Sequence, residues 1–216
     1  MSHEIRAVLF DAVGTLIYPD PPVAAAYAAA GARFGSRWTA DEIQPRFRAA
    51  FARQEALDVR QHGERTSEAR ENARWQAIVS EVFDDVADPS GLFAALWQHF
   101  AEPRHWRPHA DALELWSGYA AQDIVLGIAS NFDGRLRTIC QGLPPLDTCR
   151  HLFVSSELGV RKPSTQFFRA IEQRLKLRPD QLLLIGDDWQ NDYLGATAAG
   201  WKAKEVRGRR PEVRED

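Results

Sequence analysis

The sequence predicts an α/β fold in which a parallel sheet, covered by helices, carries an inserted all-helical subdomain. Short apolar runs alternate with helical segments after residue 105. This order is typical of a parallel sheet with helices on both faces. Residues 19–105, in contrast, are rich in Ala and Arg and contain almost no strand-like run. We therefore expect residues 1–18 and 106–216 to form the core and residues 19–105 to form the helical insert.

The first strand is expected at residues 6–10, a short apolar run that Gly14 and Thr15 follow as turn residues. In the insert, Thr39 before two acidic residues and Asp88 before Pro89 are typical of helix starts. The tryptophans of the insert are expected to pack its small core; they are Trp38, Trp75 and Trp97. The helices expected there span residues 22–34, 40–57, 67–84 and 90–101.

After the insert, helices and strands are expected to alternate. The predicted helices span residues 110–121, 134–141, 165–177 and 190–199. The predicted strands span residues 124–129, 152–155, 182–185 and 202–206. The charged tail at 208–216 is expected to be a frayed terminus. Because parallel strands end at the same edge of a sheet, residues that follow different strands are expected to meet there.

Composition excludes several classes of function. The chain has 216 residues, which is enough for a sizeable core, and a net charge of −3, which gives no basic field for nucleic acid. No apolar run approaches the roughly 20 residues that span a bilayer, and the N-terminus does not resemble a signal peptide. Cys140 and Cys149 suit ordinary thiols in a reducing compartment. We expect a cytoplasmic protein, a monomer or homodimer, with no membrane or nucleic-acid partner.

Asp11 is the most informative residue, because it places a carboxylate directly after an apolar strand and just before the Gly14-Thr15 turn. A carboxylate in that position lies at the mouth of an open α/β sheet, where ligands bind. It can form a covalent acyl intermediate or hold a cation. The segment predicts a nucleophile or a metal ligand.

Four segments, in order, resemble the motifs of the haloacid dehalogenase (HAD) superfamily, and together they span most of the chain. The first contains Asp11, Gly14 and Thr15; the second is Ser130-Asn131-Phe132-Asp133 after an apolar run; the third is Lys162-Pro163; and the fourth is Gly186-Asp187-Asp188 followed by Asn191-Asp192. The resemblance implies a Rossmann-like core, a helical cap inserted after the first motif, and a hydrolase that acts on a small anionic molecule.

The resemblance also implies a role for each matching residue. Asp11 would be the nucleophile, Lys162 would offset negative charge, and Ser130 would hold the transferred group. Asn131 and Thr15 would be further substrate contacts. Mg²⁺ is the implied cofactor, and it prefers oxygen ligands. Its ligands would be Asp11, Asp187 and the backbone carbonyl of Val13, with Asp188 and Asp192 as more distant carboxylates. Asp188 suits a helix N-cap equally well.

Val13 departs from the pattern, because the phosphatases of the superfamily carry a second aspartate at this position. That residue protonates the leaving oxygen and then deprotonates the attacking water, which is worth about 10² to 10⁴ in rate. One reading is therefore a Mg²⁺-dependent phosphatase of small phosphorylated metabolites, with weak activity. A second is a 2-haloacid dehalogenase, since halide leaves without a proton, although that branch carries a Tyr here and lacks the Gly-Asp metal motif. A third is an inactive metal-binding protein whose cap binds a partner.

Other residues carry weaker expectations. A phosphonate hydrolase is disfavoured, because it requires a lysine in the cap and no lysine precedes Lys162. Anion binding by arginines of the cap or of the third motif is disfavoured too, and a surface position is expected for Arg33, Arg37 and Arg161. His105 and His109 flank the end of the insert and are expected to be hinge or surface residues.

Overall fold

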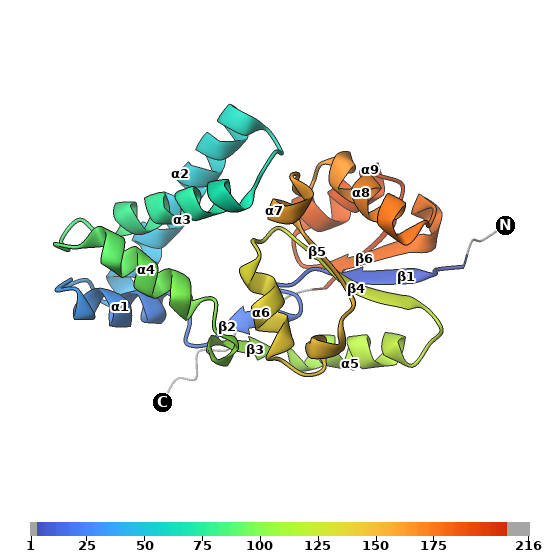
Figure 1. Ribbon diagram of the computed structural model, residues 1–216, viewed down its shortest axis with the longest axis horizontal. Coiled ribbons are helices and arrows are strands. Elements are labelled where there is room, and N and C mark those ends of the chain that lie inside the picture. The colour runs from blue at the N-terminus through green and yellow to red at the C-terminus, as the bar shows by residue number, and fades with distance from the viewer. Residues whose placement is uncertain (1–3, 207–216) are drawn as a thin grey trace.

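The computed structural model describes residues 4–206 and has two parts, a sheet-containing core and a helical cap (Figure 1). The core holds a five-stranded parallel sheet in the order β5-β4-β1-β6-β7. This confirms the predicted α/β fold. The predicted tail at 208–216 lies outside the described residues. The sheet strands are β1 (Ala7–Phe10), β4 (Val125–Ser130), β5 (His151–Val154), β6 (Leu182–Gly186) and β7 (Lys202–Glu205).

Strand β1 lies in the middle of the sheet and is fully buried, because helices cover both faces. Alternate residues point to opposite sides, so Val8 and Phe10 pack with helices α5 and α6, whereas Ala7 and Leu9 pack with helices α8 and α9. An uninterrupted apolar run is the pattern that such two-sided burial requires. The core helices are α5 (Ala110–Ala120), α6 (Arg135–Gln141), α7 (Ser155–Leu158), α8 (Thr165–Leu175) and α9 (Gly195–Ala198).

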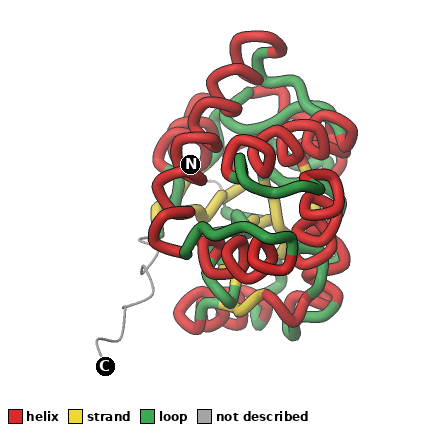
Figure 2. The backbone as a smooth tube through the Cα atoms, turned by 90° about the vertical axis from the view of Figure 1, so that its left-hand side faces the viewer, coloured by secondary structure: helices red, strands yellow, loops and turns green. Residues whose placement is uncertain are grey.

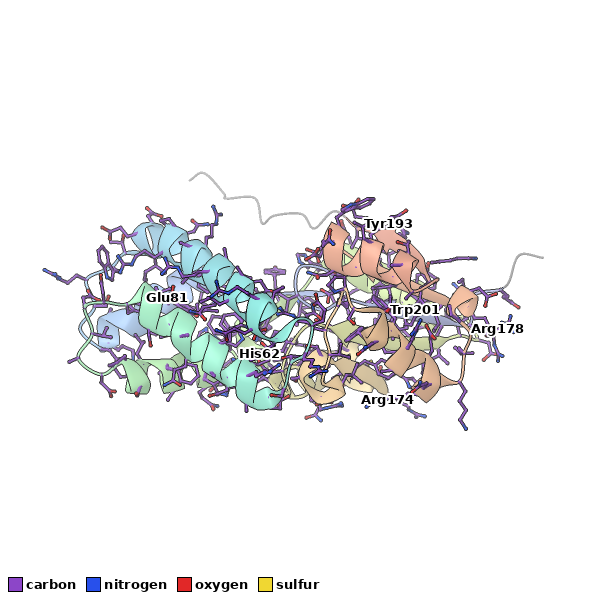
Figure 3. All side chains as sticks on the ribbon, turned by 90° about the horizontal axis from the view of Figure 1, so that it is seen from above. His62, Glu81, Arg174, Arg178, Tyr193 and Trp201 are labelled. Carbon is purple, nitrogen blue, oxygen red and sulfur yellow. The ribbon has the colours of Figure 1, made fainter. Side chains whose placement is uncertain are left out.

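The cap consists of four helices around a separate apolar cluster, and Figures 2 and 3 show it from its own side and from above. Two predicted helix starts are confirmed. Thr39 forms a reciprocal capping box with Glu42, and the Asp88 carboxylate accepts a hydrogen bond from the Gly91 amide at 2.8 Å. The cap helices are α1 (Val23–Arg33), α2 (Ala40–His62), α3 (Glu68–Val82) and α4 (Pro89–His99).

A short antiparallel ribbon carries the chain from the core to the cap and back. It pairs β2 (Ile17–Pro19) with β3 (Trp106–Pro108), next to the predicted boundaries at residues 19 and 105. The His109 amide donates to the Leu16 carbonyl at 2.8 Å and closes one end of the ribbon. These strands are absent from the sequence prediction, because three residues are too few to show alternation. His105 and His109 lie beside the two ends of β3.

The last predicted helix, at 190–199, differs from the structure. The chain first forms a π-helical turn, η4 (Trp189–Leu194), and only then α9. The Asp188 carbonyl accepts from the Tyr193 amide at 3.3 Å, which is the i to i+5 bond of a π-helix. Shorter 3₁₀ turns are η1 (Pro103–His105), η2 (Leu146–Thr148) and η3 (Pro179–Gln181).

The tryptophans of the cap divide between two environments. Trp38 and Trp75 pack against the apolar cluster of the cap, as predicted. Trp97 packs on Phe93 of the cap, with ring centroids 5.6 Å apart, and its ring centre also lies 3.6 Å from the guanidinium carbon of Arg135, a core residue. Trp97 therefore helps to join cap and core.

The two thiols are free, as predicted, and burial raises the pKa of Cys140 to about 12. Across the chain from residue 4 to residue 206, no helix has both the length and the apolarity that crossing a bilayer requires.

Replacing Leu9 by Ala is expected to lower the free energy of unfolding by about 2–5 kcal/mol, because it leaves a cavity beneath the central strand. Urea denaturation measures this loss. Val59→Ala, at an exposed position of α2, is the matched control and should change stability by less than about 0.5 kcal/mol. Equal losses in the two variants would contradict the placement of the core.

Candidate active site

The carboxyl edge of the sheet gathers the residues that the sequence singled out. Asp11 follows β1, Ser130 ends β4 and Asp187 follows β6, and β1 lies between the other two strands. Together with residues of the cap they line a cavity of about 420 Å³. The predicted site residues that line it are Asp11, Val13, Ser130, Asn131, Lys162, Asp187, Asp188 and Asp192.

Lys162 is the central charge of this edge and is fully buried. Its ammonium group has three donors, and all are used. They bond the Asp11 Oδ1 atom at 2.7 Å, the Asp192 Oδ1 atom at 2.5 Å and the Ala129 carbonyl at 3.0 Å. Burial alone would lower the pKa of Lys162, but the two carboxylates outweigh it and hold the pKa above its ordinary value. Lys162 is therefore a fixed cation beside Asp11.

Thr15 and Gly14 position Asp187. The Thr15 hydroxyl donates to the Asp187 Oδ1 atom at 2.8 Å, so its observed partner is this carboxylate. Gly14 has a φ of +93°, and a Cβ atom there would lie 2.4 Å from Asp187 Oδ2. Burial and the nearby Asp11 charge raise the pKa of Asp187, and the Thr15 bond opposes them. The substrate contact predicted for Thr15 stays a prediction.

Asp192 is buried beside Lys162, and Gly186 makes room for it. A Cβ atom on Gly186 would lie 2.1 Å from Asp192 Oδ2. Burial and the nearby Asp11 charge together raise the pKa of Asp192 to about 6, against the lowering effect of Lys162. Asp192 therefore lies closer to the centre of the site than the outer position predicted for it.

Three carboxylates at this edge fit a divalent cation. One oxygen from each of Asp11, Asp187 and Asp192 lies within 4.8 Å of the other two. An oxygen-rich group of this kind suits Mg²⁺ or a similar hard cation. Six carboxylates and three cationic side chains line the whole cavity, an excess of three negative charges if all are ionised. An anionic ligand would meet repulsion there unless a bound cation offset it.

Ser130 and Asn131 differ in how they use their polar atoms. Ser130 is 2% exposed, and within residues 4–206 its hydroxyl has no hydrogen-bond partner, so it is available to a ligand in the cavity. The Asn131 side chain accepts from the Lys162 amide at 2.8 Å and donates to the Lys162 carbonyl at 2.9 Å. Asn131 therefore fixes the lysine backbone as well as lining the cavity.

Asp188 caps the π-helical turn. Its carboxylate accepts from the amides of Gln190 and Asn191, each at 2.9 Å. The N-cap alternative for Asp188 is therefore confirmed, although the residue also lines the cavity. Val13 is exposed into the same cavity, where the phosphatase pattern places an acid.

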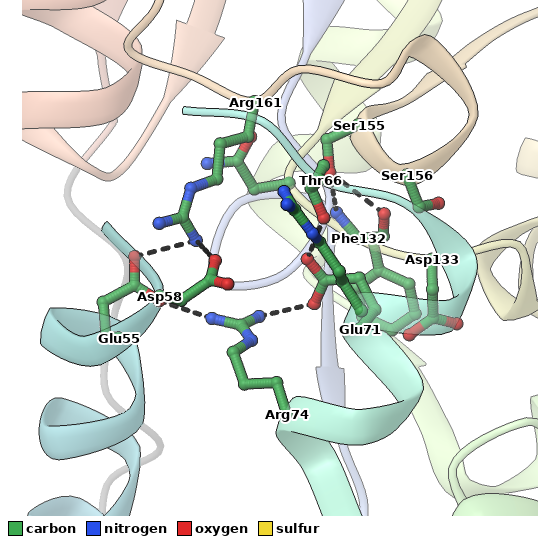
Figure 4. A network of polar contacts seen from close by, with 12 residues as sticks. Glu55, Asp58, Thr66, Glu71, Arg74, Phe132, Asp133, Ser155, Ser156 and Arg161 are labelled. Carbon is green, nitrogen blue, oxygen red and sulfur yellow. Dashed lines mark hydrogen bonds and ion pairs between the residues drawn. The ribbon is translucent and has the colours of Figure 1, made fainter. Parts of the chain in front are cut away.

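The cap closes the cavity with charged side chains in an ion-pair network (Figure 4). Arg74 of α3 bonds Glu55 and Glu71, and Glu55 also pairs with Arg161 of the core at 3.1 Å. Arg161 is 4% exposed, so the surface position predicted for it was wrong. The carboxylates that surround it come from the cap and compensate its charge; Asp58 is another. Arg33 and Arg37 are exposed, as predicted.

The loop between α2 and α3 also pairs with the core backbone. The Arg161 amide donates to the Glu64 carbonyl at 2.9 Å, and the Thr66 amide donates to the Gly159 carbonyl at 3.1 Å. These bonds hold the cap against the residues immediately before Lys162. The contribution of the cap to this side of the cavity was not predicted from the sequence. The only available signals were local, namely Phe51 and Glu55 four residues apart on one helix face.

Comparison with known proteins identifies the family. The model of the haloacid dehalogenase-like hydrolases matches residues 5–200, so the chain belongs to that family. An uncharacterized hydrolase of Schizosaccharomyces pombe is 26% identical over 94% of this chain and 90% of its own length.

Two solved structures share the fold. A defluorinating L-2-haloacid dehalogenase has a TM-score of 0.73 at 19% identity and covers 95% of this chain and 82% of its own. The HAD-hydrolase YfnB from Bacillus subtilis, bound to magnesium, has a TM-score of 0.67 at 23% identity, with 96% of each chain covered.

Lys162→Met should lower the free energy of unfolding in EDTA by about 3–5 kcal/mol at pH 7, because two buried carboxylates lose their cation. Burial and the Asp11 charge already raise the pKa of Asp192, and the variant loses the lowering effect of Lys162, so in the folded variant this pKa lies above that of the unfolded chain. Stability is therefore lost as pH rises through the folded pKa of Asp192, and the loss should be smaller at pH 5 than at pH 7. Urea titrations at both pH values measure it.

Lys202→Met, at an exposed position of β7, is the control for this variant and should be nearly neutral at both pH values. A Lys162→Met protein with wild-type stability in EDTA at pH 7 would contradict the charge arrangement described above.

Proposed function

We propose that this chain is a Mg²⁺-dependent hydrolase of a small phosphorylated metabolite, with Asp11 as its nucleophile. The observation that carries the proposal is the arrangement around Asp11, where Lys162 bonds one carboxylate oxygen and two further carboxylates complete a cation site. Among the described residues no protein group bonds the other oxygen, Oδ2, which is free to attack. The magnesium-bound Bacillus subtilis relative of the same fold is consistent with this proposal.

The residues have distinct roles in the proposed reaction. Asp11, Asp187 and Asp192 fit the cation in this structure, and the Val13 carbonyl is the further ligand that the family resemblance implies. When bound, Mg²⁺ supplies positive charge that stabilises the phosphoryl oxygens in the transition state. The Ser130 hydroxyl donates a hydrogen bond to the transferred group, and Lys162 holds the Asp11 carboxylate in place. The cap keeps bulk water from the covalent intermediate. We place this protein in the cytoplasm.

A second candidate, hydrolysis of 2-haloacids, is favoured by one specific observation. Val13 cannot protonate a leaving group, and halide needs no proton. The haloacid dehalogenase that shares the fold is consistent with this candidate. The third alternative is an inactive metal-binding protein. A panel of phosphate esters and 2-haloacids, assayed with and without Mg²⁺, separates the three, and only the inactive protein would leave the whole panel unchanged.

Asp11→Asn should reduce turnover by about 10³-fold or more, because an amide cannot act as the nucleophile. The fold should survive, since Lys162 keeps its bond to Asp192. Phosphate release measures activity and circular dichroism measures folding. Asp123→Asn, at an exposed position before β4 on the opposite edge of the sheet, is the control and should keep wild-type activity. A folded Asp11→Asn protein that retains activity would show that Asp11 is not the nucleophile.

Asp187→Ala should weaken Mg²⁺ binding by at least about tenfold, because it removes one of the three carboxylates of the cation site. Isothermal titration calorimetry with MgCl₂ alone measures the affinity without any assay of turnover. Asp123→Ala is the control and should bind like wild type. Equal affinities for wild type and Asp187→Ala would rule out this site.

A further inference from the structure

A second cavity, of about 290 Å³, lies beside the first and between cap and core. We call it the aromatic cavity, because most of the side chains that line it are aromatic. They come from the cap helices α1, α2 and α3, from the segment after α4, and from the core. The rings include Tyr27, Phe47, Phe51, Trp75, Trp106 and Phe132.

The aromatic cavity adjoins the catalytic edge. Val13 and Asn131 of the core and Phe51 and Arg74 of the cap line both cavities. Val13 follows Asp11 by two residues and lines both cavities, so it lies where the cavity at Asp11 meets the aromatic cavity. A ligand with its phosphoryl group at Asp11 can therefore extend past Val13 into the aromatic cavity.

Size and polarity define what fits in the aromatic cavity. An apolar cavity of about 150 Å³ holds a benzene molecule, so 290 Å³ is enough for a group of one or two rings. Neighbouring rings such as Phe47, Trp75 and Tyr27 offer the edge and face contacts that aromatic groups prefer.

The charges beside these rings are compensated. The Arg135 guanidinium is engaged by the Asp133 carboxylate at 2.7 Å and lies over the Trp97 ring. Arg74 is paired with Glu55 and Glu71. Both arginines that line the aromatic cavity are thus paired with carboxylates, and the Arg74 Nε atom alone is left without a hydrogen-bond partner among the described residues. The compensated charges and the mostly aromatic lining favour an apolar group as the occupant.

Val13 points to the same kind of substrate by an independent route. The side chain at this position would face the leaving group, and a valine cannot donate a proton to it. A phenolic oxygen, with a pKa of about 10, leaves as an anion far more readily than an aliphatic alkoxide, whose conjugate acid is as weak an acid as water. An acid is therefore least needed when the leaving group is an aromatic oxygen.

We infer that the substrate is a phosphate monoester of an aromatic hydroxyl compound, and that its ring occupies the aromatic cavity as the leaving group. The inference rests on the proposed function and narrows it to a substrate class. Two separate observations converge on it: the ring-lined cavity next to Asp11, and the apolar side chain of Val13 at the junction.

The reaction balances without an acid at position 13. The Asp11 carboxylate forms a bond to phosphorus while the bond from phosphorus to the aromatic oxygen breaks, and the electron pair leaves on that oxygen. Water then attacks phosphorus and the bond to Asp11 breaks, which regenerates the carboxylate. One hydrogen of the water stays on hydrogen phosphate, and the other reaches the aryloxide through solvent.

Four esters separate ring recognition from leaving-group chemistry. Phenyl phosphate has a ring and a good leaving group; benzyl phosphate has a ring and an alkoxide; acetyl phosphate is small with a good leaving group; and ethyl phosphate is small with an alkoxide. With Mg²⁺, wild type should prefer phenyl over benzyl phosphate by about 10²-fold or more in kcat/KM. Val13→Asp should narrow this ratio by raising benzyl phosphate turnover about 10² to 10⁴-fold.

A variant of the cavity tests ring recognition. Trp75→Leu should raise the KM for phenyl phosphate about tenfold and leave that for acetyl phosphate unchanged. Trp38→Leu is the matched control, because Trp38 belongs to the same cap and lies outside the lining of the aromatic cavity. If Trp75→Leu does not fold, Phe47→Leu tests ring recognition in the same way, because Phe47 also lines the aromatic cavity.

Binding gives a readout that does not depend on turnover. Phenylphosphonate, which is not hydrolysed, should bind at least tenfold more tightly than methylphosphonate in calorimetry, and Trp75→Leu should abolish the difference. Equal binding of the two phosphonates by wild type, or equal turnover of phenyl and benzyl phosphate, would overturn the inference and leave the proposed function intact. Failure to hydrolyse any of the four esters, acetyl phosphate included, would overturn the proposed function and the inference with it.

Discussion

The arrangement of polar groups at the carboxyl edge of the sheet depends on one buried ammonium group. Lys162 comes from the segment between α7 and α8, yet its three hydrogen bonds reach the end of β1, the end of β4 and the π-helical turn after β6. Buried carboxylates are tolerated only when they are paired, so this single cation fixes where Asp11 and Asp192 lie. One ammonium for three neighbouring carboxylates still leaves a deficit of positive charge. That deficit of positive charge suits the edge to a divalent cation.

Cap and core contribute different kinds of side chain to the two adjoining cavities. The core provides ionised and hydrogen-bonded groups on strand ends, where the sheet holds them rigidly. Most of the aromatic rings beside them belong to the cap, and they impose shape rather than charge. This division explains how one fold serves enzymes with different chemistries. Because Val13 lines both cavities, a substitution there is expected to change the proposed reaction and the binding surface at once.

The strand ends and their polar residues could be predicted because their signals are local. The apolar run before Asp11 specifies a buried strand, and parallel strands bring their ends to one edge. The burial of Arg161 could not be predicted, since the carboxylates that compensate it, such as Glu55 and Asp58, lie about 100 residues earlier in the chain. The aromatic cavity could not be predicted for a different reason. Along its helix, Trp75 has the same spacing from the other apolar residues whether its ring fills a core or lines a cavity. Only the packing of the other helices decides between the two positions.

The backbone pairing between the α2–α3 loop and the segment before Lys162 has an evolutionary consequence. Glu64 and Thr66 bond Arg161 and Gly159, so the part of the cap nearest the core is attached one residue away from the central ammonium. Substitutions that reshape this loop would displace the lysine as well. Variation that tunes substrate choice is therefore expected to accumulate in the ring-bearing parts of α1, α2 and α3, away from residues 63–67. The sequence of the cap is therefore expected to vary most where the cap makes no contact with the segment that holds Lys162.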